Sequence, residues 1–181
     1  MTDSSITPEY SVILNIASLG ETTKHFPLKA NAEAREGLAR RFNLLSIDVL
    51  TADLTAKRIG KGKLIRVYGE IKASIVQACV ISGAPVPERI EETIEERYRP
   101  SAKITLEVEV SMDAEDPPEP IIDNKIDLGE IVSQYLGVAI HPYPRASGVE
   151  VPAAYQEEGD EQPETQKNPF LALAALKKNR D

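Results

Sequence analysis

Five positively charged side chains lie within ten residues in the first half of the sequence. They are Lys57, Arg58, Lys61, Lys63 and Arg66. Cationic groups at this density are typical of a surface that contacts the phosphates of a nucleic acid. A nucleotide-binding phosphate loop is excluded, because Gly60 and Gly62 lack the four intervening residues and no Ser or Thr follows Lys63. The cluster predicts phosphate contact; the alternative is a set of hairpin lysines that provide solubility and protect a sheet edge.

A proline-rich loop carries a second group of side chains suited to binding, namely His141, Tyr143 and Arg145. Pro142 and Pro144 fix φ on either side of Tyr143 and favour extended conformations in the residues before them. The loop is therefore predicted to be stiff and to present its side chains. The alternative is that Tyr143 closes the end of the core and Arg145 binds a carboxylate.

The sequence predicts neither a catalytic site nor a metal site. Cys79 is the one cysteine, and it continues the apolar face of a predicted strand with no base close to it in the sequence. With two histidines, His25 and His141, no recognisable set of metal ligands forms. The acidic residues between 113 and 119 lack the spacing of a calcium loop. We expect a protein that is not an enzyme and needs no cofactor.

The net charge of −8 is distributed unevenly. Residues 1–72 carry 11 Lys/Arg and 8 Asp/Glu, whereas residues 73–181 carry 10 and 21. An acidic chain repels phosphate at long range, but screening over about 8 Å lets a local basic patch bind RNA. The sequence shows no secretion leader and no apolar run of the roughly 20 residues that a membrane span needs. We expect a cytoplasmic protein without membrane contact.

The first half of the chain predicts strands over 10–18, 47–59 and 64–80 and a helix over 30–42. Apolar side chains recur every four residues in the helical stretch. Residues 64–80 alternate between apolar and polar, which indicates an antiparallel sheet with one face in water. Glycines in the turn 60–63 supply the positive φ that a tight hairpin needs.

Residues 86–99 leave two interpretations open, because apolar side chains at every fourth position suit a helix or a strand. We prefer a strand, since residues 104–110 alternate cleanly and need a partner. Residues 113–124 combine acids with three prolines, which predicts a loop.

A capped amphipathic helix is predicted over 127–136. Asp127 can cap its first amides, and Glu130 can reach back to the amide of the cap residue. One apolar stripe follows, formed by Leu128, Ile131, Val132, Tyr135 and Leu136. Gly137 fits the left-handed residue that ends such a helix.

The sequence therefore predicts an α+β fold with a mainly antiparallel sheet, open or barrel-like, and two packed helices. The predicted organisation is a domain over 1–148, a disordered acidic linker over 149–167, and a short helix over 168–181. That terminal helix is too short to hold its structure alone in water. We expect it to dock on a partner through Phe170, Leu173 and Leu176; the alternative is that it packs on the domain's own sheet.

Three segments of the chain together resemble a known bacterial family. They are residues 78–87 (ACVISGAPVP), 126–145 (IDLGEIVSQYLGVAIHPYPR) and 168–177 (NPFLALAALK). In order and spacing they are similar to the YceD family of large ribosomal RNA subunit accumulation proteins, and to its alphaproteobacterial branch in particular. Many relatives carry a second cysteine three residues after the first, in an arrangement that looks like a zinc site. This chain has Ser82 there, so zinc is not expected.

The resemblance implies a non-enzymatic factor for the synthesis, processing or stability of 23S ribosomal RNA and for biogenesis of the large ribosomal subunit. Its implied partner is large-subunit ribosomal RNA or a pre-ribosomal particle, bound directly or indirectly. The alternative is an acidic adaptor or chaperone that holds a basic ribosomal protein without touching RNA.

Overall fold

The structure is a computed structural model that describes residues 8–61, 64–100 and 118–150. The chain divides into two compact units, Met1–Ser147 and Gly148–Asp181, and almost all described residues belong to the first. Several predicted features lie outside the described residues: the strand over 104–110, the acidic linker beyond residue 150, and the terminal helix with Phe170, Leu173 and Leu176.

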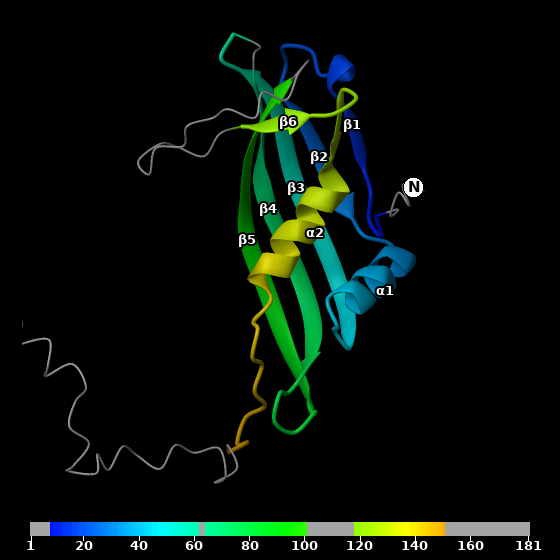
Figure 1. The fold of residues 1–181 in the computed structure, drawn as a ribbon, viewed down its shortest axis with the longest axis vertical. Coiled ribbons are helices and arrows are strands. Elements are labelled where there is room, and N and C mark those ends of the chain that lie inside the picture. The colour runs from blue at the N-terminus through cyan, green and yellow to red at the C-terminus, as the bar shows by residue number, and fades with distance from the viewer. Residues whose placement is uncertain (1–7, 62–63, 101–117, 151–181) are drawn as a thin grey trace, which may run out of the picture. The chain divides into compact units, whose positions relative to one another are not determined.

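A five-stranded sheet dominates the fold (Figure 1). Its strands, in spatial order, are β2 (Lys24–Lys29), β3 (Ser46–Ile59), β4 (Leu64–Ala78), β5 (Pro85–Pro100) and β6 (Glu119–Ile121). The first four are antiparallel, whereas β6 runs parallel to β5. A two-stranded sheet joins β1 (Ile13–Asn15) to β7 (Lys125–Asp127), and the helices are α1 (Ala32–Arg41) and α2 (Leu128–Ala139).

The α+β class and the mainly antiparallel sheet are confirmed. The described strands form no closed barrel, because β2 and β6 lie at opposite ends of their order and do not pair with each other. The strand interpretation of residues 86–99 is correct, since β5 pairs with β4 from Pro85 to Tyr98.

Both helices pack on one face of the large sheet, which we call the inner face. Leu38 of α1 and Leu136 of α2 are fully buried in one cluster with Leu54, Val67 and Ile71 of the sheet. Burying such a side chain contributes about 1.5–3 kcal/mol relative to leaving it in water. In Figure 1, α2 crosses in front of the long strands β3, β4 and β5. No described helix packs on the opposite, outer face.

The N-terminal segment differs from the prediction of one strand over 10–18. Only Ile13–Asn15 is a strand, and a single 3-10 turn, Ile16–Ser18, follows it. The Asn15 side chain causes the change: its oxygen accepts a hydrogen bond from the amide of Ala17 at 2.9 Å. This local bond competes with continued strand pairing.

The segment 113–124 was predicted to be a loop, which is wrong for Glu119–Ile121 and correct for the turn at Asp123 and Asn124. Residues Glu119–Ile121 form β6, and a turn at Asp123 and Asn124, both with positive φ, leads into β7. The strands form because Ile121 and Ile126 are buried in the core. Their partners, β5 and β1, are distant in sequence, so no local pattern indicated them.

Helix α2 runs to Ala139 and not to residue 136. Gly137 lies inside the helix, so its predicted role as the residue that ends it is wrong. A Cβ at this position would lie 2.8 Å from the ring of Phe42, closer than such contacts occur. Glycine is therefore required here for close packing between the end of α1 and α2.

Candidate nucleic-acid interface

Strand register brings three cations into one row on the outer face. Lys57 of β3 is the direct partner of Arg66 of β4, and Arg66 is the direct partner of Arg97 of β5. Side chains of such pairs are about 5 Å apart and share one face. We call Lys57, Arg66 and Arg97 the cation row. Arg97 was not among the predicted contact residues, because only long-range register places it beside the others.

The aromatic ring of Tyr68 lies against two members of the row. Lys57 Nζ is 5.4 Å and Arg66 Cζ is 4.7 Å from the ring centroid, which is cation–π distance. Arg66 also forms an ion pair with Glu95, 2.9 Å between Nη2 and Oε1. Both partners of that ion pair are partly exposed, and such pairs contribute at most about 1 kcal/mol. A phosphate can therefore replace Glu95 at little cost.

A hollow of about 520 Å³ opens on the outer face next to the row. This volume lies within the range of small-molecule sites. Its lining residues are His25, Asp53, Thr55, Arg66, Tyr68, Gly69, Glu70, Thr93, Ile94 and Glu95. Thr55 is buried, and its hydroxyl is 3.0 Å from Nδ1 of His25, which fixes the β2 side of the hollow.

Gly69 makes this part of the sheet possible. Its φ is +158°, and a Cβ there would collide with the backbone carbonyl of Asp53 on β3. The two strands come too close at this point for any side chain. Position 69 therefore carries none, and the space beside Tyr68 stays open as part of the hollow.

The other predicted cationic residues do not join the row. Arg58 follows Lys57, so strand alternation turns it to the opposite face, where it donates to the carbonyls of Leu19 and Ile16 at 2.8 and 2.7 Å. Arg58 thereby anchors the 3-10 turn. Lys61 is exposed in the hairpin turn with φ of +58°, and Lys63 lies outside the described residues.

The proline-rich loop lies beside the first residues of β5. His141, Tyr143 and Arg145 line a shallow pocket of about 490 Å³ together with Val86, Pro87, Glu88 and Pro144. Tyr143 is 68% exposed, so the alternative that it closes the core is wrong; Pro144 is the buried residue. Backbone contacts hold the loop: Val80 N donates to Pro144 O at 2.9 Å, and Gln77 Nε2 donates to His141 O at 2.9 Å.

Cys79 is buried, as its place on the apolar strand face indicated. The fold nevertheless surrounds its sulfur with donors that the sequence did not suggest. Hydrogen bonding by Ser82 and by the amide of Ala146 lowers the pKa of the thiol to about 6, although burial acts in the opposite direction. Ala146 N is 3.3 Å from Sγ, across 67 positions of sequence. No group of three or more metal-ligating side chains occurs among the residues that the structure describes.

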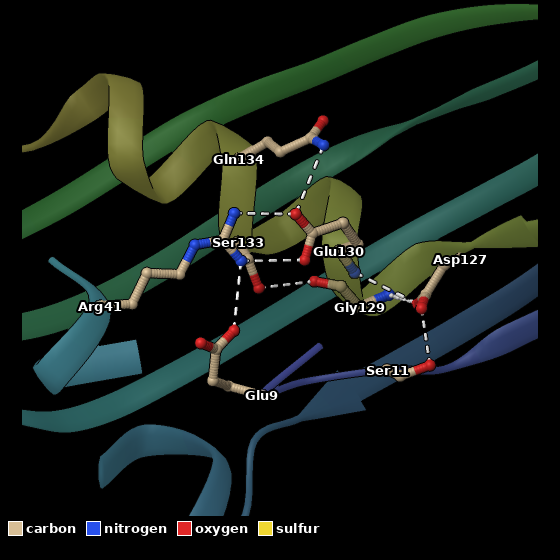
Figure 2. Close-up of polar contacts among 8 residues, drawn as sticks. All are labelled: Glu9, Ser11, Arg41, Asp127, Gly129, Glu130, Ser133 and Gln134. Atoms are coloured by element: carbon tan, nitrogen blue, oxygen red, sulfur yellow. Dashed lines mark hydrogen bonds and ion pairs between the residues drawn. The ribbon is translucent and has the colours of Figure 1, made fainter. Parts of the chain in front are cut away.

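A polar cluster ties the N-terminal segment and α1 to the start of α2 (Figure 2). Asp127 is the N-cap: Oδ1 accepts from the amides of Gly129 and Glu130 at 3.0 and 3.2 Å, and also from Val12 at 2.9 Å. Its Oδ2 accepts from the Ser11 hydroxyl at 2.6 Å. This one carboxylate therefore joins two segments that are far apart in sequence.

Glu130 does not make the predicted contact with the cap residue and binds Arg41 instead. Two guanidinium nitrogens donate to its two carboxylate oxygens at 3.1 and 2.9 Å (Figure 2). Arg41 also pairs with Glu9 at 3.3 Å. The Arg41 pair gives Glu130 two charge-assisted hydrogen bonds, whereas the capping contact would give it one.

The comparisons place this fold in a class of proteins connected with large-subunit ribosomal RNA. A family model described as "Large ribosomal RNA subunit accumulation protein YceD" matches residues 67–177, more than half of the chain. The chain belongs to the YceD family. The matched region contains Tyr68, Arg97 and the proline-rich loop but begins just after Arg66. No curated protein and no solved structure matched the chain. Among the described residues, neither helix is long and apolar enough to cross a membrane.

Proposed function

We propose that the protein promotes the accumulation of 23S ribosomal RNA and the biogenesis of the large subunit by binding RNA directly, in the cytoplasm and without catalysis. One observation carries this proposal: the cation row stands beside Tyr68 on a sheet face that no described helix covers. The combination of phosphate-binding cations with an aromatic side chain is common in proteins that bind single strands.

The net charge of −8 does not oppose this assignment at short range. Charges separated by more than about 8 Å are largely screened under cellular salt. The row concentrates three positive charges within neighbouring strands, which are about 4.8 Å apart. A phosphate at the row therefore experiences Lys57, Arg66 and Arg97 together with the single carboxylate of Glu95, which pairs with Arg66.

The double variant Lys57→Gln and Arg66→Gln tests phosphate contact. Binding of in vitro transcribed 23S RNA fragments is measured across a salt series. Each lost phosphate contact on a single strand lowers the log-log salt slope by about 0.7, so the double variant should lose about 1.4. The matched control is Lys29→Gln with Arg89→Gln, two exposed cations six and eight positions along the strand register from the row, which should keep the slope. An unchanged slope in the first variant contradicts direct contact through the row.

The same double variant tests whether RNA binding through the cation row is needed for 23S RNA accumulation in the cell. A strain without this protein should show less 23S than 16S RNA, and the control variant should restore the ratio. The Lys57→Gln, Arg66→Gln variant should not restore it.

The adaptor alternative has its own supporting observation on β5. Five glutamates lie within nine residues of this strand: Glu88, Glu91, Glu92, Glu95 and Glu96. Such a strand suits a basic ribosomal protein. If the adaptor is correct, neutralising Glu91 and Glu92 weakens capture of basic large-subunit proteins, while the cation-row variant leaves function intact.

A further inference from the structure

The charge of the outer face changes sign across the hollow. The cation row lies at one side, with Arg66 paired to Glu95. The next positions along β3, β4 and β5 hold Thr55, Tyr68 and Glu95, and the positions after those hold Asp53, Glu70 and Thr93. Four residues of strand separate Arg66 from Glu70, about 13 Å at 3.3 Å per residue. Cations, an aromatic ring and carboxylates thus follow one another across one open site.

A single nucleotide has the matching order of groups. Its phosphate suits the row, its base can stack beside the Tyr68 ring or the Arg66 guanidinium, and its hydrogen-bond donors suit the carboxylates. A second phosphate does not suit the acidic side. The Arg66 side chain is 33% exposed and pairs through Nη2 with Glu95, which a phosphate on Arg66 displaces.

We propose that the hollow binds one unpaired base of single-stranded RNA, with the adjoining phosphate on the cation row. This inference rests on the proposed function and adds the class of RNA. Bases in a duplex are stacked and paired and cannot enter the hollow, whereas unpaired bases stack on aromatic side chains and bind through their Watson–Crick edges.

The carboxylates of Asp53 and Glu70 also select the base. Both side chains are exposed at the hollow and accept hydrogen bonds. Guanine offers two adjacent N–H donors on its Watson–Crick edge, which suit one carboxylate. Uracil offers one donor between two carbonyl oxygens, which the carboxylates repel. The site therefore prefers guanine over uracil.

The experiment measures binding of the full chain to three labelled RNAs by fluorescence anisotropy. They are a uridine hexamer, the same hexamer with one central guanosine, and a blunt duplex. The hexamer with guanosine should bind more tightly than the other two. Tyr68→Ala should weaken binding of both hexamers about tenfold and leave the duplex unchanged. The variant Asp53→Asn with Glu70→Gln should remove the preference for guanosine; far-ultraviolet circular dichroism and melting temperature check the fold of each variant.

The outcomes distinguish failure of the proposed base site from failure of the proposed RNA-binding function. If Tyr68→Ala affects hexamers and duplex equally or not at all, while Lys57→Gln with Arg66→Gln weakens both, the base site is wrong and phosphate contact stands. If wild-type protein binds none of the RNAs, or the cation-row variant binds all of them as wild type does, the proposed function fails as well. Equal affinity for the two hexamers overturns the assigned base.

Discussion

Replacing Asp127 by alanine should destabilise the protein by about 2 kcal/mol. Loss of an N-cap costs about 1 kcal/mol. The amide of Val12, which is partly buried, also loses its acceptor, and an unsatisfied amide in such a place costs about 1 kcal/mol more. Ser11 is exposed, so water replaces its bond at little cost. In a protein of this size the sum corresponds to a fall of about 4–8 °C in melting temperature.

The matched control is Asn31→Ala at the N-cap of α1. Asn31 makes a cap bond to the amide of Ala34 at 2.8 Å but holds no distant segment, so its loss should cost only about 1 kcal/mol. Asp127→Asn keeps a good capping residue and should lie between wild type and Asp127→Ala. Urea unfolding with a shared m-value gives the free energies. If Asp127→Ala costs no more than Asn31→Ala, the bond to Val12 does not stabilise the fold as reasoned.

Two further changes test the sheet and the buried thiol. Gly69→Ala should lower the free energy of unfolding in urea by about 2–5 kcal/mol, because backbone strain adds to the collision with the Asp53 carbonyl. The control Gly83→Ala has a φ of +71° but open space around it, so it should cost only about 1–2 kcal/mol. Equal costs for the two variants would contradict the close approach of β3 and β4. Because the pKa of Cys79 is lowered from 9.0 to about 6, the unfolded chain binds more protons between these values, so the melting temperature of wild type should rise from pH 6 to pH 9 relative to Cys79→Ala. A constant difference between the two proteins over this range would show that the thiol titrates normally.

Patterns that depend on near neighbours predicted the fold well. The alternation in β4 identified a long strand, because burial of one sheet face imposes a period of two. The spacing of Ile90, Ile94 and Tyr98 in β5 suited a helix as well as a strand, and the strand was preferred because residues 104–110 needed a partner. The cap at Asp127 is similarly local. The predictions that were wrong concern features that depend on contacts between distant segments. Gly137 packs on Phe42, and the short strands at 119–127 pair with β5 and β1.

The candidate site was predictable only in part. The density of positive charge correctly predicted that Lys57 and Arg66 lie together. The same density also led to the prediction of Arg58 as a contact residue, although strand alternation places it on the other face. Arg97 and the hollow at Gly69 needed the register of three strands. The donors around Cys79 arrive in part from a loop that begins after α2, so nothing near the cysteine revealed its lowered pKa.

The position of α2 in the chain has a consequence for synthesis. Strands β3, β4 and β5 are complete by Pro100, but α2, one of the two helices on their inner face, begins at Leu128 and ends at Ala139. At about 5–20 residues per second, a ribosome needs about 2–8 seconds to make the 39 residues between Pro100 and Ala139. During that interval the part of the apolar sheet face that α2 covers lacks this helix, although α1 has already been made. Chaperone capture of stalled chains should therefore peak between these two points, and chains released there should aggregate.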